Sequence, residues 1–139
     1  MNRSREFAEL LLRKAQGDAW MLNRAVSEQG APPWALGFHA QQAVEKAIKA
    51  VLTVLSVEYP RTHNLALLMD LLRQRGQRLP PDAAELPRLT PFGALLRYDE
   101  DQQFEASPVQ VDRAWMRNCV ERTLAWAEKA IAPGPTGGS

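Results

Sequence analysis

The chain has 139 residues, of which 45% are hydrophobic and 24% charged, and its net charge at pH 7 is +1. This length and composition predict a single globular domain with one core. The near-neutral charge excludes a general attraction to nucleic acids or membranes, so any contact with RNA would depend on a local patch.

Cysteine usage and the ends of the sequence bear on the compartment. Cys119 is the one cysteine, so no internal disulfide can form, as expected in a reducing cytoplasm. The N-terminal MNRSREF lacks the apolar core of a signal peptide, and no apolar run approaches the ~20 residues of a membrane span. We therefore expect a cytoplasmic protein that does not enter the membrane. The Pro/Gly-rich residues 133–139 predict a disordered tail after a domain over residues 1–132.

Apolar periodicity predicts three helices in the first half of the chain. The first covers about residues 3–28, and Trp20 lies off its apolar side, either as ordinary surface or as part of an oligomer contact. Pro32 and Pro33 favour the start of a second helix that runs to about residue 56. Thr62 or Asn64 is expected to cap a third helix, which ends near residue 76.

The second half of the chain predicts a broken helix and a final long one. Pro80 and Pro81 begin a short helical segment that Pro87 and Pro91 interrupt before it continues to Tyr98. The acidic residues 99–101 are expected to form a loop. Ser107 and Pro108 are a typical start for the last helix. No strand pattern is present, so we predict an all-α antiparallel up-and-down bundle of four to five helices.

Two polar residues lie in the apolar side of the second helix. At ~100° per residue, Gln41 and Glu45 fall beside Ile48 and Leu52. A separate polar stripe carries four side chains, namely His39, Gln42, Lys46 and Lys49. A buried carboxylate needs a cation or hydrogen-bond donors, because burial alone costs several kcal/mol.

The candidates for a partner of Glu45 are Arg97, Tyr98, Arg61 and His63. We favour Arg97, because its surroundings in the sequence are apolar and its planar guanidinium suits a carboxylate. The buried pair Glu45–Arg97 has two interpretations. It either fixes how two helices dock, or it lines a polar groove that binds a ligand or a partner protein.

These residues resemble a known family. The segments FHAQQAVEKAIKAVL, RTHNLALLMDLL and LLRYDED together resemble the HEPN domain family, in particular its short free-standing prokaryotic members. The resemblance covers about residues 3–131. It implies a bundle of four or five helices that usually forms a homodimer and often works beside a small nucleotidyltransferase. In some such pairs, the HEPN protein is a toxin and ribonuclease and the transferase is its antitoxin.

Ribonucleases of this family carry an arginine followed, after four to six residues, by a histidine that transfers protons. His39 and His63 are the two histidines here, and neither follows an arginine at that spacing. After Arg97, the corresponding positions are Gln102, Gln103 and Phe104. The ribonuclease motif is therefore absent, and we expect a non-catalytic protein.

Three hypotheses follow for the function. The first is a homodimeric, non-catalytic partner of a small nucleotidyltransferase, as in toxin–antitoxin pairs, whose pairing surface includes the second and final helices. The second is a degenerate RNA endonuclease, and the third is a nucleotide-binding module. No metal site or cofactor is expected, apart from a nucleotide ligand. The predicted groove for a nucleotide or partner comprises His39, Gln42, Glu45, Lys46, Lys49, Arg61, His63, Arg97 and Tyr98.

Overall fold

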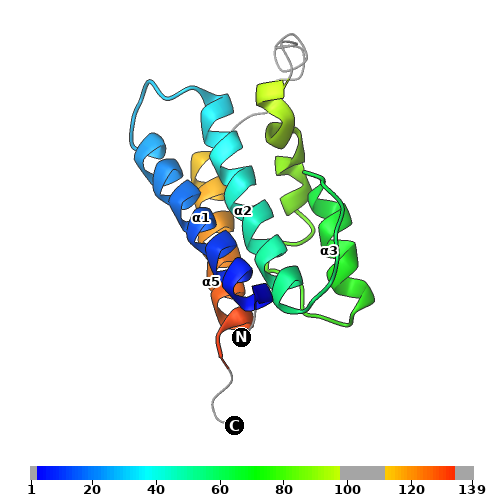
Figure 1. The fold of residues 1–139 in the computed structure, drawn as a ribbon. Coiled ribbons are helices and arrows are strands. Elements are labelled where there is room, and N and C mark those ends of the chain that lie inside the picture. Colours follow the sequence, from blue (N-terminus) through cyan, green and yellow to red (C-terminus); the bar gives the residue numbers. More distant parts are fainter. Residues whose placement is uncertain (1–2, 98–111, 134–139) are drawn as a thin grey trace.

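The computed structural model describes residues 3–97 and 112–133, with side chains described for all of these except residues 94–97. The fold is an all-α bundle, as the sequence predicted (Figure 1). Its elements are α1 (Arg3–Val26), α2 (Pro33–Val54), α3 (Leu65–Gln74), the 3-10 helix η1 (Leu86–Arg97) and α5 (Arg113–Ile131). None of the helices in this part of the chain has both the length and the hydropathy that a membrane crossing requires.

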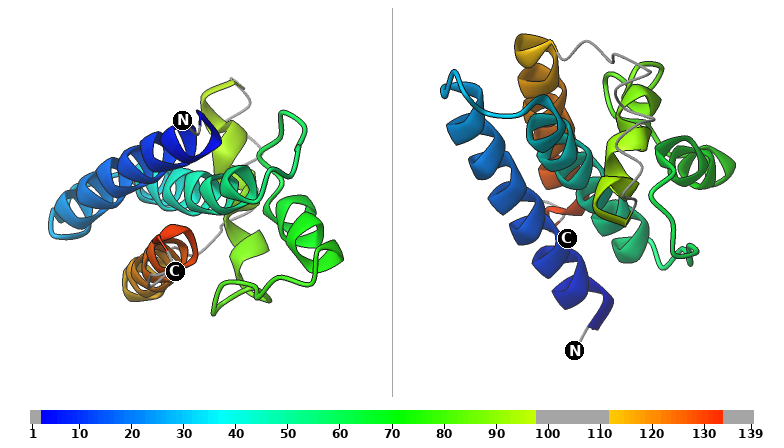
Figure 2. Two further views of the ribbon diagram at one scale, coloured as in Figure 1. Left: turned by 60° about the horizontal axis from the view of Figure 1, so that its bottom comes forward. Right: turned by 90° about the horizontal axis from the view of Figure 1, so that it is seen from above.

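α2 is the central helix of the bundle. It contacts each of the other four elements, and Figure 2 shows it enclosed between α1, α5 and the pair formed by α3 and η1. Ala40, Val44, Ala47 and Ile48 are fully buried, and small residues on several sides of the helix allow neighbours to approach it closely. Exposed side chains on α2 are confined to its first two residues, Pro33 and Trp34. Apart from this first turn, α2 therefore offers little surface to a partner protein.

The predicted helix ends have clear local causes. Pro33 occupies the first turn of α2, where its missing N–H is not needed. The side chain of Asn64 accepts a hydrogen bond from the backbone N–H of Leu67 and so caps α3, as predicted. Gly76 follows α3 with a φ of 67°, a left-handed conformation that glycine adopts without steric cost.

The second half of the chain departs in detail from the sequence prediction. The broken helix is a 3-10 helix that contains Pro91, which has no N–H to donate to a regular α-helix. α5 begins at Arg113, where the carboxylate of Asp112 caps the N–H of Trp115. The predicted cap at Ser107 and the acidic loop at 99–101 lie outside the described residues, as does most of the predicted tail.

The connector between α2 and α3 runs back alongside α2. Near the end of the helix, the hydroxyl groups of Tyr59 and Thr53 lie 3.2 Å apart. Further along the connector, the backbone carbonyl of His63 accepts a hydrogen bond from Gln41, more than three turns before the end of α2. This path places His63 opposite the middle of α2, where Glu45 also lies.

η1 packs very closely against the opposite end of α2. A Cβ atom at Gly37 would overlap the ring of Phe92, and a Cβ atom at Gly93 would lie 2.6 Å from the Cδ atom of Gln41. Two glycines, one on each element, therefore bring η1 into contact with α2. This contact covers Gln41, whose side chain is fully buried.

Candidate functional site

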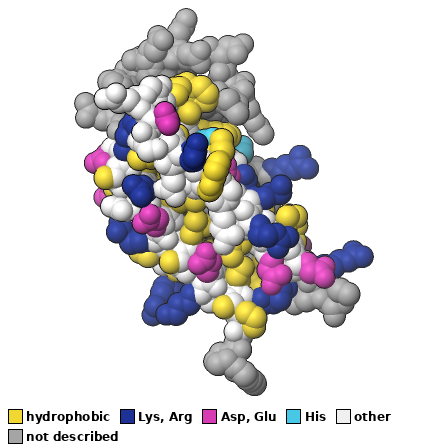
Figure 3. All heavy atoms as spheres, turned by 90° about the vertical axis from the view of Figure 1, so that its left-hand side faces the viewer, with side chains coloured by type: hydrophobic (Ala, Val, Ile, Leu, Met, Phe, Trp, Pro, Cys, Tyr) yellow, Lys and Arg dark blue, Asp and Glu magenta, His cyan; other side chains and the backbone are white. Residues whose placement is uncertain are grey.

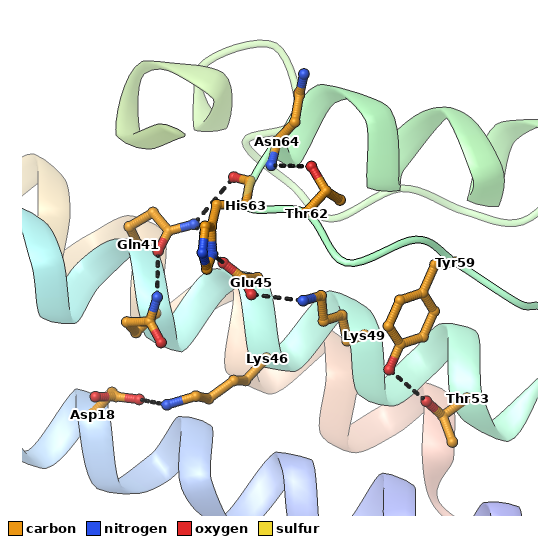
Figure 4. Close-up of polar contacts among 11 residues, drawn as sticks. Asp18, Gln41, Glu45, Lys46, Lys49, Thr53, Tyr59, Thr62, His63 and Asn64 are labelled. Atoms are coloured by element: carbon orange, nitrogen blue, oxygen red, sulfur yellow. Dashed lines mark hydrogen bonds and ion pairs between the residues drawn. The ribbon is translucent and has the colours of Figure 1, made fainter. Parts of the chain in front are cut away.

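The carboxylate of Glu45 is the centre of a buried polar cluster. The residue is 4% exposed, as the sequence predicted. Its Oε2 accepts a hydrogen bond from Nζ of Lys49 at 2.7 Å, and its Oε1 lies 2.8 Å from Nδ1 of His63 (Figure 4). We define Gln41, Glu45, Lys49 and His63 as the Glu45 cluster. Its members come from α2 and from the connector that runs back along it.

Gln41 links the carboxylate to the connector backbone. Its Nε2 donates to Oε1 of Glu45 at 2.8 Å and to the carbonyl of His63 at 3.2 Å, while its Oε1 accepts from Nε2 of Gln42 at 2.8 Å. The carboxamide therefore uses both of its hydrogen atoms and its oxygen. A buried amide with all its polar atoms bonded stabilises one arrangement of the surrounding backbone.

The surroundings of Glu45 keep it ionised. Burial by itself raises the pKa of the carboxyl. Hydrogen bonds from Lys49, Gln41 and His63 lower the pKa by a larger amount in total, so it lies below its usual 4.5. An ionised carboxylate only accepts hydrogen bonds. Nδ1 of His63 therefore carries the hydrogen in this contact, and Nε2 is the nitrogen left for other partners.

A second, similar cluster joins α1 to the other side of α2. Asp18 of α1 accepts a hydrogen bond from Nζ of Lys46 at 2.6 Å, and its other oxygen lies 3.1 Å from Nδ1 of His39. We define these three residues as the Asp18 cluster. Each histidine of the chain thus contacts a carboxylate that is also bound by a lysine. Both clusters hold a neighbouring segment against α2.

The structure divides the residues of the predicted groove between these two clusters. Lys49 and His63 meet Glu45, and Gln42 joins them through Gln41. His39 and Lys46 face Asp18 of α1 instead, because they occupy another side of α2. The predicted polar stripe of α2 is therefore not one continuous surface. His63, one of the four candidate partners of Glu45, does contact it.

The remaining groove residues do not join either cluster in the described part of the chain. Arg61 is exposed in the connector. The side chains of Arg97 and Tyr98 lie outside the residues described, so the pair Glu45–Arg97 stays a prediction. Both oxygens of Glu45 nevertheless have partners among the described residues.

Two features of these polar clusters were not predicted from the sequence. The first is the pairing of Lys49 with Glu45, although a glutamate four residues before a lysine is a common helix pair. On the helical wheel, Lys49 falls in the separate polar stripe, which does not suggest this contact. The second is Asp18, an acidic residue beside the buried Ala15, Ala19 and Leu22 of α1, which is a detectable sign of an interhelical contact.

The chemical capacity of the site follows from this geometry. His63 is oriented by a carboxylate, its side chain is 32% exposed, and its Nε2 has no hydrogen-bond partner among the described residues. Within residues 3–97 and 112–133, no three side chains of metal-binding type come together. The N-terminus of α3 is poorly suited to binding an anion, because two of its backbone N–H groups already donate hydrogen bonds within the chain. The N–H of Leu67 donates to Asn64, and that of Leu65 donates to Thr90.

We predict that Glu45→Gln lowers the free energy of unfolding by about 1–3 kcal/mol, because it removes the charge that Lys49 and His63 bind. The measurement is urea unfolding followed by far-UV circular dichroism. The matched control is Glu128→Gln in α5, where an exposed hydrogen bond to Gln16 is changed instead. If both substitutions change the free energy of unfolding by less than about 0.5 kcal/mol, Glu45 contributes no more to stability than a surface residue does.

The lowered pKa of Glu45 also predicts a pH dependence. Because the folded pKa lies below 4.5, the ionised group stabilises the fold above its unfolded pKa, and this contribution is lost as pH falls through the folded value. The stability difference between the wild type and Glu45→Gln should therefore be full near neutral pH and shrink in acid. Urea unfolding of both proteins at a series of pH values tests this. A difference that grows on acidification would mean that the pKa of Glu45 is raised instead.

One of three comparisons with known proteins gave a match, and it covers nearly all of the helical bundle. A family model described as the HEPN domain matches residues 8–131, which include α1, α2, α3, η1 and α5 almost completely. Searches of curated proteins and of solved structures gave no significant match. The matched region contains both polar clusters and the connector between α2 and α3. The chain therefore belongs to the HEPN domain family.

Proposed function

We propose that this HEPN-family chain is a non-catalytic, homodimeric protein that acts as the partner of a small nucleotidyltransferase. The observation that carries the proposal is the use of its two histidines. Neither stands at the arginine–histidine spacing of the ribonuclease members, and each contacts a carboxylate that also binds a lysine. Such contacts hold helices and connectors together. The resemblance to free-standing members that accompany a nucleotidyltransferase supplies the identity of the partner.

The arrangement of α2 indicates where a partner does not bind. This helix is covered by α1, α5, α3 and η1. Its polar side chains Lys46 and Glu45 therefore meet Asp18 of α1 and His63 of the connector rather than a second protein. A protein partner would therefore contact outer helices, in particular α1, α3 or the exposed side of α5.

We predict that a nucleotidyltransferase encoded beside this chain co-elutes with it and binds it at micromolar concentrations. Both proteins are purified separately, checked for folding by circular dichroism, mixed, and followed by size-exclusion chromatography and calorimetry. A nucleotidyltransferase of similar size from an unrelated gene neighbourhood is the control. Separate elution of two folded proteins, with no heat of binding, would reject the partnership.

The same preparation tests the alternative of a degenerate endonuclease. The protein is incubated with RNA beside His63→Ala, and the folding of the variant is checked in parallel. Our proposal predicts intact RNA in both samples. Cleavage that disappears with His63→Ala, while the fold persists, would establish a ribonuclease in place of a non-catalytic partner.

One observation favours a second candidate, the binding of a nucleotide phosphate. Arg61 is exposed, and it lies two positions before the partly exposed His63. Neither the guanidinium of Arg61 nor Nε2 of His63 has a hydrogen bond or ion pair among the described residues. Lys49 is close by, although its charge is already shared with Glu45. These cations could contact a phosphate through side chains rather than through the occupied N-terminus of α3.

We predict that, if this candidate is right, ATP binding is lost in Arg61→Ala and kept in Arg78→Ala, a change of another exposed arginine. Removing Arg61 takes away the one cation of this segment that has no protein partner among the described residues. Isothermal titration calorimetry with ATP measures the effect. A flat trace for the wild type removes the nucleotide candidate and leaves the partner proposal unchanged.

A further inference from the structure

Exposed apolar side chains are concentrated on α1. In the part of the chain that the structure describes, four of the six exposed large hydrophobic residues belong to this helix: Phe7 (48% exposed), Leu10 (37%), Trp20 (60%) and Met21 (45%). Figure 3 views the side on which α1 lies in Figure 1, and apolar side chains reach this surface at several heights among charged ones. Isolated exposed apolar residues are common, but several on one helix are typical of a contact surface.

Two of these four residues, Leu10 and Met21, lie opposite the core side of α1. Ala15 and Leu22, seven residues apart, are fully buried. At ~100° per residue, Leu10, Gly17 and Met21 share the outer side of the helix, and Phe7 borders it. A Cβ atom at Gly17 would meet no atom within 4 Å, so the middle of this outer side is open. A second helix can approach closely at such a position.

We propose that the outer side of α1 pairs with the same surface of a second copy of this chain, with the two helices antiparallel and a two-fold axis between Lys14 and Gly17. In this arrangement, Leu10 lies opposite the partner's Met21, and the aliphatic part of Lys14 covers the open position at the partner's Gly17. The two-fold symmetry makes each of these contacts twice. α1 has 24 residues and extends over about 36 Å, so the pairing runs along a substantial length.

Charge favours the antiparallel direction. In the antiparallel pair, Glu6 lies one residue away from the position that faces the partner's Arg24. Within one chain, the guanidinium of Arg24 lies 5.5 Å from the ring centre of Trp20. A parallel pair would instead place Glu6 against Glu6 and Arg24 against Arg24, and like charges at these positions oppose association. The opposite charges near the two ends of the helix thus select one orientation.

This inference rests on the proposed function, because it assigns a surface to the homodimer proposed there. It also separates that surface from the site of any second protein. If α1 is covered by another copy, a nucleotidyltransferase must bind elsewhere, on α3 or on the exposed side of α5. Binding of the nucleotidyltransferase is measured independently, so it can succeed or fail whatever the outcome for α1.

The first test measures molar mass by light scattering from low to high micromolar concentration. The wild type is expected to have the mass of two chains, and Met21→Lys is expected to weaken dimerisation at least about tenfold. Leu67→Lys, a similar change at an exposed leucine of α3, is the matched control and should leave the dimer intact. Thermal unfolding by circular dichroism checks that both variants keep their fold.

The second test determines the direction of pairing by cross-linking. Two singly substituted chains, Leu10→Cys and Met21→Cys, carry different tags and are oxidised as a mixture. The native Cys119 does not interfere, because it is fully buried and burial raises the pKa of its thiol to about 11. Antiparallel pairing predicts the mixed disulfide as the main product, since the two positions lie opposite each other.

Each alternative outcome overturns a defined part of the proposal. A wild type that stays a single chain at all concentrations rejects both the α1 surface and the homodimer. A dimer that Met21→Lys leaves intact rejects the α1 surface alone and places the homodimer interface elsewhere. A dimer that cross-links mainly as Leu10→Cys with Leu10→Cys is parallel, which contradicts the proposed orientation.

Discussion

A buried carboxylate must find partners inside the protein, and the way Glu45 meets this requirement organises the middle of the molecule. An ionised carboxylate at 4% exposure would be unstable without compensation. The compensation comes from Lys49 on the same helix and from Gln41 and His63, which bond both to the carboxylate and to each other. The connector that carries His63 is thereby held along α2, and the position of α3 follows from it.

The same solution occurs twice around α2. The Asp18 cluster joins this helix to α1 in the way that the Glu45 cluster joins it to the connector. In each cluster a carboxylate, a lysine and a histidine meet at the border of the apolar core. Such contacts contribute specificity of docking more than net stability, because removing charges from water is itself costly. The two clusters explain why the polar residues of α2 do not form an open groove: they are bonded to neighbouring parts of the chain.

With α2 enclosed, the surfaces for partners must lie on other helices. The largest exposed apolar residues of the described chain lie on α1 and at the start of α2, and none of them belongs to either polar cluster. The region matched by the HEPN domain model, residues 8–131, includes all of these residues except Phe7. Internal organisation and association with other molecules therefore depend on different residues of this protein, which allows each to be altered separately.

Much of the fold could be predicted from the sequence because its signals are local. Helical periodicity, Pro33 and the caps at Asn64 and Gly76 each depend on a few neighbouring residues. The burial of Glu45 also followed from the helical wheel. Its partners depended on the path of the connector, which no periodicity encodes. Lys49 could have been found from its spacing, whereas contact with His63 required the chain to turn back along α2.

The prediction for η1 shows the same limit. Prolines indicated an interrupted helix, but its close approach to α2 depends on Gly37 and Gly93 acting together across the interface. Residues far apart in the sequence meet there, and neither glycine has a local signal that distinguishes it from an ordinary turn or helix residue. For the same reason, the preference for Arg97 rested on neighbouring apolar residues rather than on any long-range constraint.

The coupling between Glu45 and His63 tests the central claim most directly. A double-mutant cycle with Glu45→Gln, His63→Ala and the combined variant, measured by urea unfolding near neutral pH, isolates this interaction. If the carboxylate holds the connector against α2 through His63, the two substitutions are coupled by more than about 1 kcal/mol. Additive effects, with coupling below about 0.3–0.5 kcal/mol, would contradict it and mean that the connector is held by other contacts.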